Sequence, residues 1–179
     1  MNENANNKKF NLLKELYELI DSVAVSAVVV IFVFALIFRM FVVNGPSMEP
    51  TLLNGDRLIV SNLFYTPKQG DIICFYSDAR DSVLVKRIIA TEGQTVDIRD
   101  DNRVYVDGVE LPEDYIGDID TTERTLELPH TVEKGHVFVM GDNRNDSLDS
   151  RYEEIGTVDT HDILGRLVIR LFPKFGTVR

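Results

Sequence analysis

The sequence predicts a mainly β protein, with one N-terminal transmembrane helix followed by a compact antiparallel β-sheet domain. Residues 22–38 carry no charged side chain and almost no polar one, as expected for a membrane span. From residue 44 onward, short runs rich in Val and Ile alternate with turn residues. Few segments after the apolar run show helical periodicity, so we expect the second part of the chain to consist of strands.

The apolar run is predicted to be a membrane anchor that is not removed. At about 1.5 Å per residue, 22–38 covers about 25 Å of helix, and continuing to Val43 covers about 33 Å. A cleaved secretory signal would be shorter and followed by a small-residue cleavage site, whereas Asn-Gly-Pro follows here. We therefore expect a transmembrane signal-anchor helix over 19–43.

The basic residues around this run predict its orientation. Three lysines lie within residues 1–18, whereas Arg39 is the one basic residue that closely follows the apolar segment. Because basic residues are enriched on the cytoplasmic side, 1–18 is predicted to be a cytoplasmic segment and 44–179 an extracytoplasmic domain. The protein would then cross the cell membrane once.

The second part of the chain reads as a series of short strands. We expect strands at 57–60, 71–76, 82–90, 96–99, 104–106, 136–140 and 163–171. Asp107-Gly108 is a strong signal for a hairpin turn. The stretch 112–125 is acidic and weakly patterned, and is predicted to be an exposed loop.

Composition excludes several classes of function. A net charge of −10 and a pI near 4.7 argue against a nucleic-acid partner, since phosphate binding needs a basic face. The single cysteine, Cys74, rules out an internal disulfide and a multi-cysteine metal site, and its apolar surroundings predict a buried structural thiol. The three histidines have no metal-ligand spacing, so neither a metal nor a cofactor is predicted.

A serine and a lysine are the candidate reactive residues. Ser47 lies in a turn-like Gly-Pro-Ser sequence just past the apolar run, where a hydroxyl can be exposed. A nucleophilic serine needs a base within hydrogen-bond reach, and none of the histidines has the sequence context of a protease triad. Lys86 interrupts a strand-like apolar run and shares a strand face with Leu84 and Ile88. Desolvation on that face would lower the lysine pKa toward the value that a general base requires.

Three motifs in this order resemble the type I signal peptidases of bacteria. They are Ser-Met-Glu-Pro-Thr-Leu at 47–52, Lys-Arg at 86–87, and Gly-Asp-Asn-Arg-Asn-Asp-Ser-Leu-Asp-Ser-Arg at 141–151. The resemblance extends from the apolar run to near Arg151. It implies a β-rich serine protease domain of signal-peptidase type on the outer face of the membrane. Its partners would be the signal peptides of exported preproteins, the phospholipid bilayer and a nearby secretion translocon, with cleavage after small-x-small (Ala-x-Ala-like) sites.

The resemblance also implies roles for individual residues. Ser47 matches the nucleophile, with its backbone N–H in the oxyanion hole, and Lys86 matches the general base. Ser147 matches a serine that orients this lysine. Four charged residues match those that hold the loop in shape, in the expected pairs Asp142 with Arg87 and Asp149 with Arg151. Three residues match the pocket that admits alanine, namely Met48, Leu84 and Val85.

Differences from the family pattern indicate which branch of the family the chain resembles and which domains it has. Gly45 stands where some Gram-negative members carry a hydroxyl donor, which points to the Gram-positive branch. Asn145-Asp146 replaces the commoner Asp-Asn, and the spacing between Lys86 and Gly141 is too short for a large inserted second domain.

Alternative readings remain open. A self-cleaving repressor of the LexA type would carry a DNA-binding domain in place of the apolar run, and a non-catalytic assembly factor would have lost Ser47 or Lys86. The sequence does not distinguish a general signal peptidase from one with a dedicated substrate.

Overall fold

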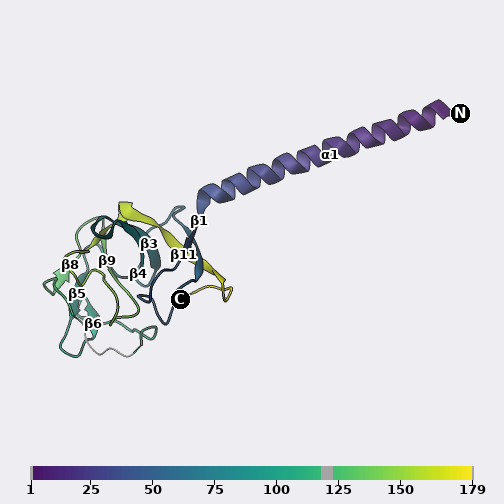
Figure 1. The fold of residues 1–179 in the computed structure, drawn as a ribbon. Helices are drawn as coiled ribbons and strands as arrows, with labels where there is room; N and C mark the ends of the chain where they lie inside the picture. Colours follow the sequence, from purple (N-terminus) through teal and green to yellow (C-terminus); the bar gives the residue numbers. More distant parts are fainter. Residues whose placement is uncertain (1, 118–122, 179) are drawn as a thin grey trace. The chain divides into compact units, whose positions relative to one another are not determined.

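The computed structural model describes the backbone of residues 2–117 and 123–178, and the side chains of 14–117 and 123–178. The chain divides into two units, of which the first ends at Ile37 and the second begins at Phe38. The first is helical and the second is built from strands (Figure 1).

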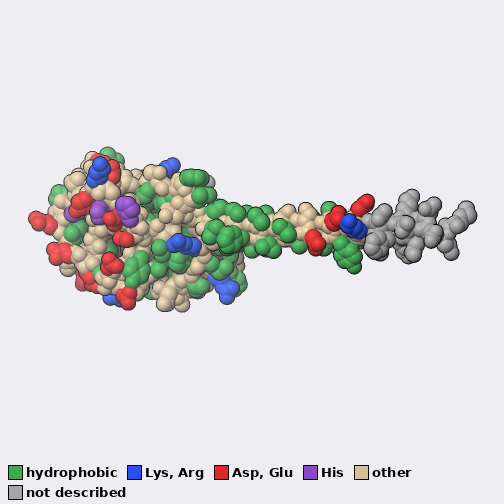
Figure 2. Space-filling view, turned by 90° about the horizontal axis from the view of Figure 1, so that it is seen from above, with side chains coloured by type: hydrophobic (Ala, Val, Ile, Leu, Met, Phe, Trp, Pro, Cys, Tyr) green, Lys and Arg blue, Asp and Glu red, His purple; other side chains and the backbone are tan. Residues whose placement is uncertain are grey.

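The first unit is a single helix, α1 (Asn2–Ile37). Its segment Lys14–Ile37 has 24 residues and is long and apolar enough to cross a membrane. Hydrophobic side chains cover this segment, with charged residues confined to its N-terminal part (Figure 2). None of this segment is buried against protein, and a helix that is apolar all round is typical of a membrane span.

The helix ends six residues before the predicted end of the span at Val43. Strand β1 (Phe38–Val42) begins directly after Ile37 and pairs antiparallel with β2 (Arg57–Ser61). In this ladder Met40 faces Ile59, and Phe41 faces Leu58. The sequence signal was ambiguous because an apolar run without Gly or Pro satisfies a helix and a strand equally well.

The larger sheet of the second unit has seven strands in the order β1-β2-β11-β3-β4-β9-β10. All its strand pairs are antiparallel. Its other strands are β3 (Ile72–Ser77), β4 (Ser82–Thr91), β9 (His136–Met140), β10 (Val158–Asp159) and β11 (Ile163–Phe172). The predicted mainly antiparallel β fold is therefore confirmed.

A four-stranded antiparallel sheet, ordered β7-β6-β5-β8, completes the unit. It consists of β5 (Thr95–Ile98), β6 (Val104–Val106), β7 (Val109–Glu110) and β8 (His130–Thr131). The predicted hairpin turn at Asp107-Gly108 joins β6 to β7, with both residues at positive φ. Two three-residue 3₁₀ helices, Asp78–Arg80 and Thr160–Asp162, lie between strands.

Seven predicted strands agree with the structure to within about a residue at each end. The short strands β7, β8 and β10 and the edge strand β1 were not predicted. Each of the first three has two residues, too few for a periodic pattern to be visible.

The segment predicted as an exposed loop, 112–125, is exposed only in part. Residues 118–122 lie outside the described residues. The Glu113 side chain is only 9% exposed, in an ion pair with Arg144, and Tyr115 is half-buried against Arg87. The prediction failed here because the partners lie roughly thirty residues away in the sequence.

One of three apolar clusters supports the segment that carries Ser47. It contains Val43, Met48, Leu52, Leu58, Ile72 and Leu167. Met48 and Leu52 flank the turn and are almost completely buried, so they anchor it to the larger sheet.

Candidate active site

Ser47 lies in the connection between β1 and β2, and the local backbone fixes its position. The amide of Glu49 donates to the carbonyl of Pro46, and that of Leu52 to the carbonyl of Met48, both at 2.9 Å. Gly45 has φ of 102°, a conformation that favours glycine, and its amide donates to Oδ1 of Asn54 at 3.0 Å. Ser47 itself stays partly exposed, next to the buried Met48.

Lys86 lies in β4, between β3 and β9, and its Nζ donates to Oγ of Ser47 at 2.8 Å. The residue is 3% exposed. Burial lowers the Lys86 pKa from 10.5 to about 8, against the opposing effect of the Asp149 charge. The amine therefore exists in its neutral form in a sizeable fraction of molecules near neutral pH. In that form its lone pair can accept the serine proton.

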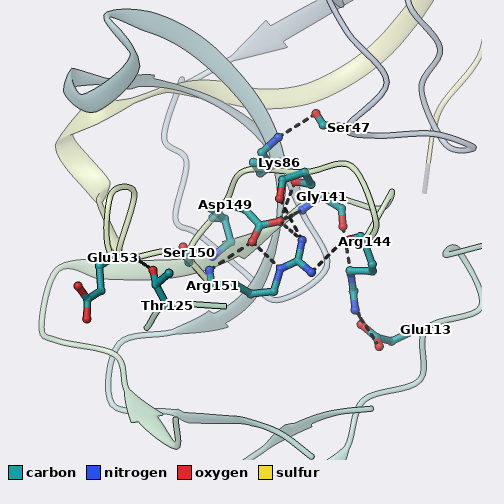
Figure 3. A network of polar contacts seen from close by, with 12 residues as sticks. Ser47, Lys86, Glu113, Thr125, Gly141, Arg144, Asp149, Ser150, Arg151 and Glu153 are labelled. Carbon is teal, nitrogen blue, oxygen red and sulfur yellow. Dashed lines mark hydrogen bonds and ion pairs between the residues drawn. The ribbon is translucent and has the colours of Figure 1, made fainter. Parts of the chain in front are cut away.

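The loop after β9 is organised around the fully buried carboxylate of Asp149. This carboxylate accepts hydrogen bonds from the amide of Gly141 at 2.9 Å, from Oγ of Ser147 at 2.7 Å and from Nε of Arg151 at 2.8 Å. The ion pair with Arg151 and these hydrogen bonds lower the Asp149 pKa, although burial alone would raise it. Figure 3 shows this network beneath the Ser47–Lys86 pair.

A second buried ion pair joins the loop to β4. Arg87 donates through Nε and Nη2 to the two oxygens of Asp142, at 2.8 and 2.7 Å. The side chains are 3% and 0% exposed, and Arg87 also donates to the carbonyl of Gly70 at 2.9 Å. Both ion pairs expected for the loop are thus present.

A cavity of about 90 Å³ opens beside the Ser47–Lys86 pair. Its walls come from the end of β1, the turn of Ser47 and the first half of β4. It is lined by Phe41, Val42, Val43, Asn44, Ser47, Met48, Val83, Leu84, Val85 and Lys86. The three residues predicted to form a substrate pocket all contact this cavity.

Comparisons with known proteins place the chain in a family. Residues 16–172 match the model of the family described as signal peptidase, peptidase S26. The chain belongs to this family.

Relatives with similar sequences extend over nearly the whole chain. It is 32% identical to signal peptidase I of Bacillus licheniformis, over 96% of both chains. It is 34% identical to signal peptidase I P of Bacillus subtilis subsp. natto, over 93% of this chain and 92% of that one. It is 33% identical to signal peptidase IB of Staphylococcus aureus, over 89% of this chain and 91% of that one.

A crystal structure of a signal peptidase I from Enterococcus faecalis is 38% identical, with a TM-score of 0.46. It covers 58% of this chain and 98% of its own. The relatives from Bacillus and Staphylococcus agree with the predicted Gram-positive branch, and family membership makes the protein a serine endopeptidase.

The predicted orienting role of Ser147 stays a prediction. Within the part of the chain that the structure describes, the Ser147 hydroxyl donates to Asp149, and no hydrogen bond joins it to Lys86. The Ser147 hydroxyl thus helps to hold the Asp149 carboxylate, whose charge raises the lysine pKa.

Four residues of the site were not singled out from the sequence. The amide of Asn143 donates to the carbonyl of Ser47 at 3.1 Å, and its Nδ2 donates to the carbonyl of Pro46 at 3.2 Å. Asn143 and Arg144 lie within the 141–151 motif, so the motif could have identified them as residues of the site. Glu113 and Tyr115 lie in the weakly patterned acidic segment, where no local signal existed. Within residues 14–117 and 123–178, no group of three His, Cys, Asp or Glu is arranged to hold a metal.

Proposed function

We propose that this signal peptidase family member is a membrane-bound endopeptidase that removes N-terminal signal peptides from exported preproteins, with Ser47 as nucleophile and Lys86 as general base. The observation that carries the proposal is the 2.8 Å contact between Nζ of the buried Lys86 and Oγ of Ser47. A lysine can act as base only where its surroundings favour the neutral amine, and burial supplies that condition here.

The reaction follows from this geometry in two stages. Neutral Lys86 accepts the hydroxyl proton as Oγ of Ser47 attacks the carbonyl carbon of the scissile bond, giving a tetrahedral oxyanion. The resulting ammonium then donates its proton to the leaving amine, and the mature protein departs. An ester between Ser47 and the signal peptide remains. Water attacks this ester, Lys86 takes its proton, and Oγ leaves and regains a proton from Lys86.

The oxyanion would be stabilised by the main-chain N–H of Ser47. Within the described residues this N–H donates no hydrogen bond, so it is available to a substrate oxygen. Such a preorganised donor strengthens its interaction as negative charge develops in the transition state. Gly45 has no side chain that could provide a second donor.

The cavity beside Ser47 favours cleavage after small residues. Its volume is about 90 Å³, and Met48, Leu84 and Val85 give it apolar walls. A methyl side chain would fit beside the nucleophile, whereas an aromatic one would have to displace the walls of the cavity, among them the buried Met48. Strand β1 is the edge strand of the larger sheet, so an extended peptide could pair with it and enter the cavity.

The apolar part of α1 is proposed to anchor the enzyme in the cell membrane, with residues 1–18 in the cytoplasm and the domain from residue 44 onward outside. Lys14–Ile37 supports the span, and the three lysines within 1–18 support the orientation. Preproteins that emerge from the translocation machinery would meet the active site on that side.

The proposal is tested with the full-length enzyme in detergent and a preprotein bearing an Ala-x-Ala site. We expect one cut, directly after the second alanine. Replacing that alanine by phenylalanine should abolish cleavage, while a phenylalanine five residues into the mature sequence serves as control. Equal cleavage of the two phenylalanine substrates would contradict the assignment of the cavity.

A further inference from the structure

The segment that follows β7 contacts the loop that carries Asp149, through a buried ion pair. Arg144 donates to the Glu113 carboxylate through Nη1, at 3.1 Å, and through Nη2 (Figure 3). The two side chains are 1% and 9% exposed. Burial alone would lower the Arg144 pKa, but the hydrogen bonds and charge of Glu113 raise it. The guanidinium is therefore charged and needs this partner in its buried position.

Arg144 in turn fixes the peptide at Gly141. Its Nε donates to the carbonyl of Gly141 at 3.0 Å, while the amide of Gly141 donates to Asp149 at 2.9 Å. The main-chain oxygen of Arg144 accepts a hydrogen bond from Nη1 of Arg151 at 2.9 Å. Gly141 is therefore held on one side by the Asp149 carboxylate and on the other by a guanidinium that Glu113 holds in place.

The peptide at Gly141 packs directly against the nucleophile segment. A Cβ added to Gly141 would lie 2.4 Å from the main-chain oxygen of Ser47, so the two backbones are in close contact. Two residues later the amide of Asn143 donates to that same oxygen at 3.1 Å. A shift of the 141–143 backbone would therefore move Ser47 relative to Lys86.

Tyr115 adds a second contact between the same segment and the site. The centroid of its ring lies 3.9 Å from Cζ of Arg87, the residue whose guanidinium binds Asp142. Glu113 and Tyr115 thus hold Arg144 and Arg87, whose partners are the first two residues of the loop.

We propose that Glu113 is a positioning residue of the peptidase, which acts through Arg144 on Gly141 and so sets the distance between Ser47 and Lys86. This inference rests on the proposed function of Ser47 and Lys86. Glu113 touches neither of them, and its effect is on turnover because the geometry of proton transfer depends on it.

The first test compares Glu113→Gln with wild type in cleavage of an Ala-x-Ala preprotein by the full-length enzyme. The glutamine keeps the shape and one acceptor but removes the charge that holds Arg144. We expect kcat to fall by about 10- to 100-fold with KM changed less than about threefold, because substrate contacts are untouched. Glu113→Asp keeps the charge and should recover part of the loss.

Glu110→Gln is the matched control. Glu110 lies three residues earlier, also in an ion pair with an arginine, Arg103, at 2.7 Å, but both side chains are about half exposed. Its replacement should leave kcat and KM at wild-type values. Thermal unfolding of each variant is measured at the same time, so that rates are compared only well below the midpoint.

A double-mutant cycle with Arg144→Met tests the route. If Glu113 acts through Arg144, Glu113→Gln should have little further effect on kcat in the Arg144→Met background. Additive losses would refute the route. A wild-type kcat in Glu113→Gln, with or without a lowered unfolding midpoint, would refute the positioning role.

If the Glu113→Gln protein does not fold, Glu113→Asp takes its place in the test. That variant must then show a kcat loss larger than that of Glu110→Gln, or the inference fails. Ser47→Ala separates this inference from the proposed function. Retained cleavage in Ser47→Ala overturns the proposed function, whereas an inactive Ser47→Ala with a fully active Glu113→Gln overturns only the role of Glu113.

Discussion

The rate of peptide-bond cleavage should fall tenfold for each pH unit below about pH 8. In the proposed mechanism only the neutral form of Lys86 can accept the serine proton. Burial lowers its pKa to about 8, so about 9% of the enzyme is in that form at pH 7 and about 1% at pH 6. An ordinary lysine with a pKa of 10.5 would be only about 0.03% neutral at pH 7. The buried site thus raises the reactive fraction about 300-fold at that pH.

The assay is the initial rate of cleavage at low substrate concentration, from pH 5.5 to 9.5, with full-length enzyme in detergent. Under this condition the rate reports kcat/KM, whose acid limb gives the pKa of the essential base in the free enzyme. The substrate should have no group that titrates in this range. Circular dichroism at each pH verifies that the fold is intact.

We expect the logarithm of kcat/KM to rise with pH at unit slope and then to level off, with the midpoint of this transition within about one unit of pH 8. A rate that is constant between pH 6 and pH 8 would refute the reasoning, since no base with the Lys86 pKa would then be limiting. A midpoint near 6.5, the ordinary value for histidine, would point to a different base.

Three further outcomes follow from the same structure. Between pH 8 and 10.5 the unfolded chain binds more protons at Lys86 than the folded one does, so the stability advantage of wild type over Lys86→Met in urea titrations should grow by about 3 kcal/mol across that window. A stability difference that stays constant from pH 8 to 10.5 would contradict the lowered pKa of Lys86. Gly141→Ala should reduce kcat at least tenfold, because its Cβ would lie 2.4 Å from the Ser47 oxygen, whereas Gly117→Ala, with open space around it, should match wild type; equal rates in the two variants would contradict this. Cys74 is 0% exposed and its pKa is raised to about 12, so iodoacetamide at pH 8 should label it only after denaturation, and rapid labelling of the native protein would contradict its burial.

The strands were predictable where a local pattern existed. β4 and β11 have ten residues each, rich in β-branched and aliphatic side chains, and both were predicted almost to their ends. β1 was not, because Phe38–Val42 continues the apolar run of α1 and no breaker separates the two. The chain leaves the helix after Ile37 to pair with β2, an interaction with residues 15 to 23 positions further along the chain.

The candidate site, like the strands, could be predicted from the sequence only in part. Ser47 and Lys86 are 39 residues apart in the chain, and only the motif resemblance indicated that they meet. The burial of Lys86 could be anticipated from the aliphatic residues on its strand face. The contacts of Glu113 and Tyr115 could not, because an acidic segment without periodicity gives no sign of a partner in a distant loop.

The central claim is that Ser47 and Lys86 together carry out the cleavage, and turnover by matched variants tests it most directly. Full-length wild type, Ser47→Ala and Lys86→Met are compared on one Ala-x-Ala preprotein at pH 8.5, with thermal unfolding measured for each. The account predicts cleavage by wild type, and none above the uncatalysed rate by either variant, with both variants folded. Cleavage by either folded variant at more than about one hundredth of the wild-type rate would contradict it.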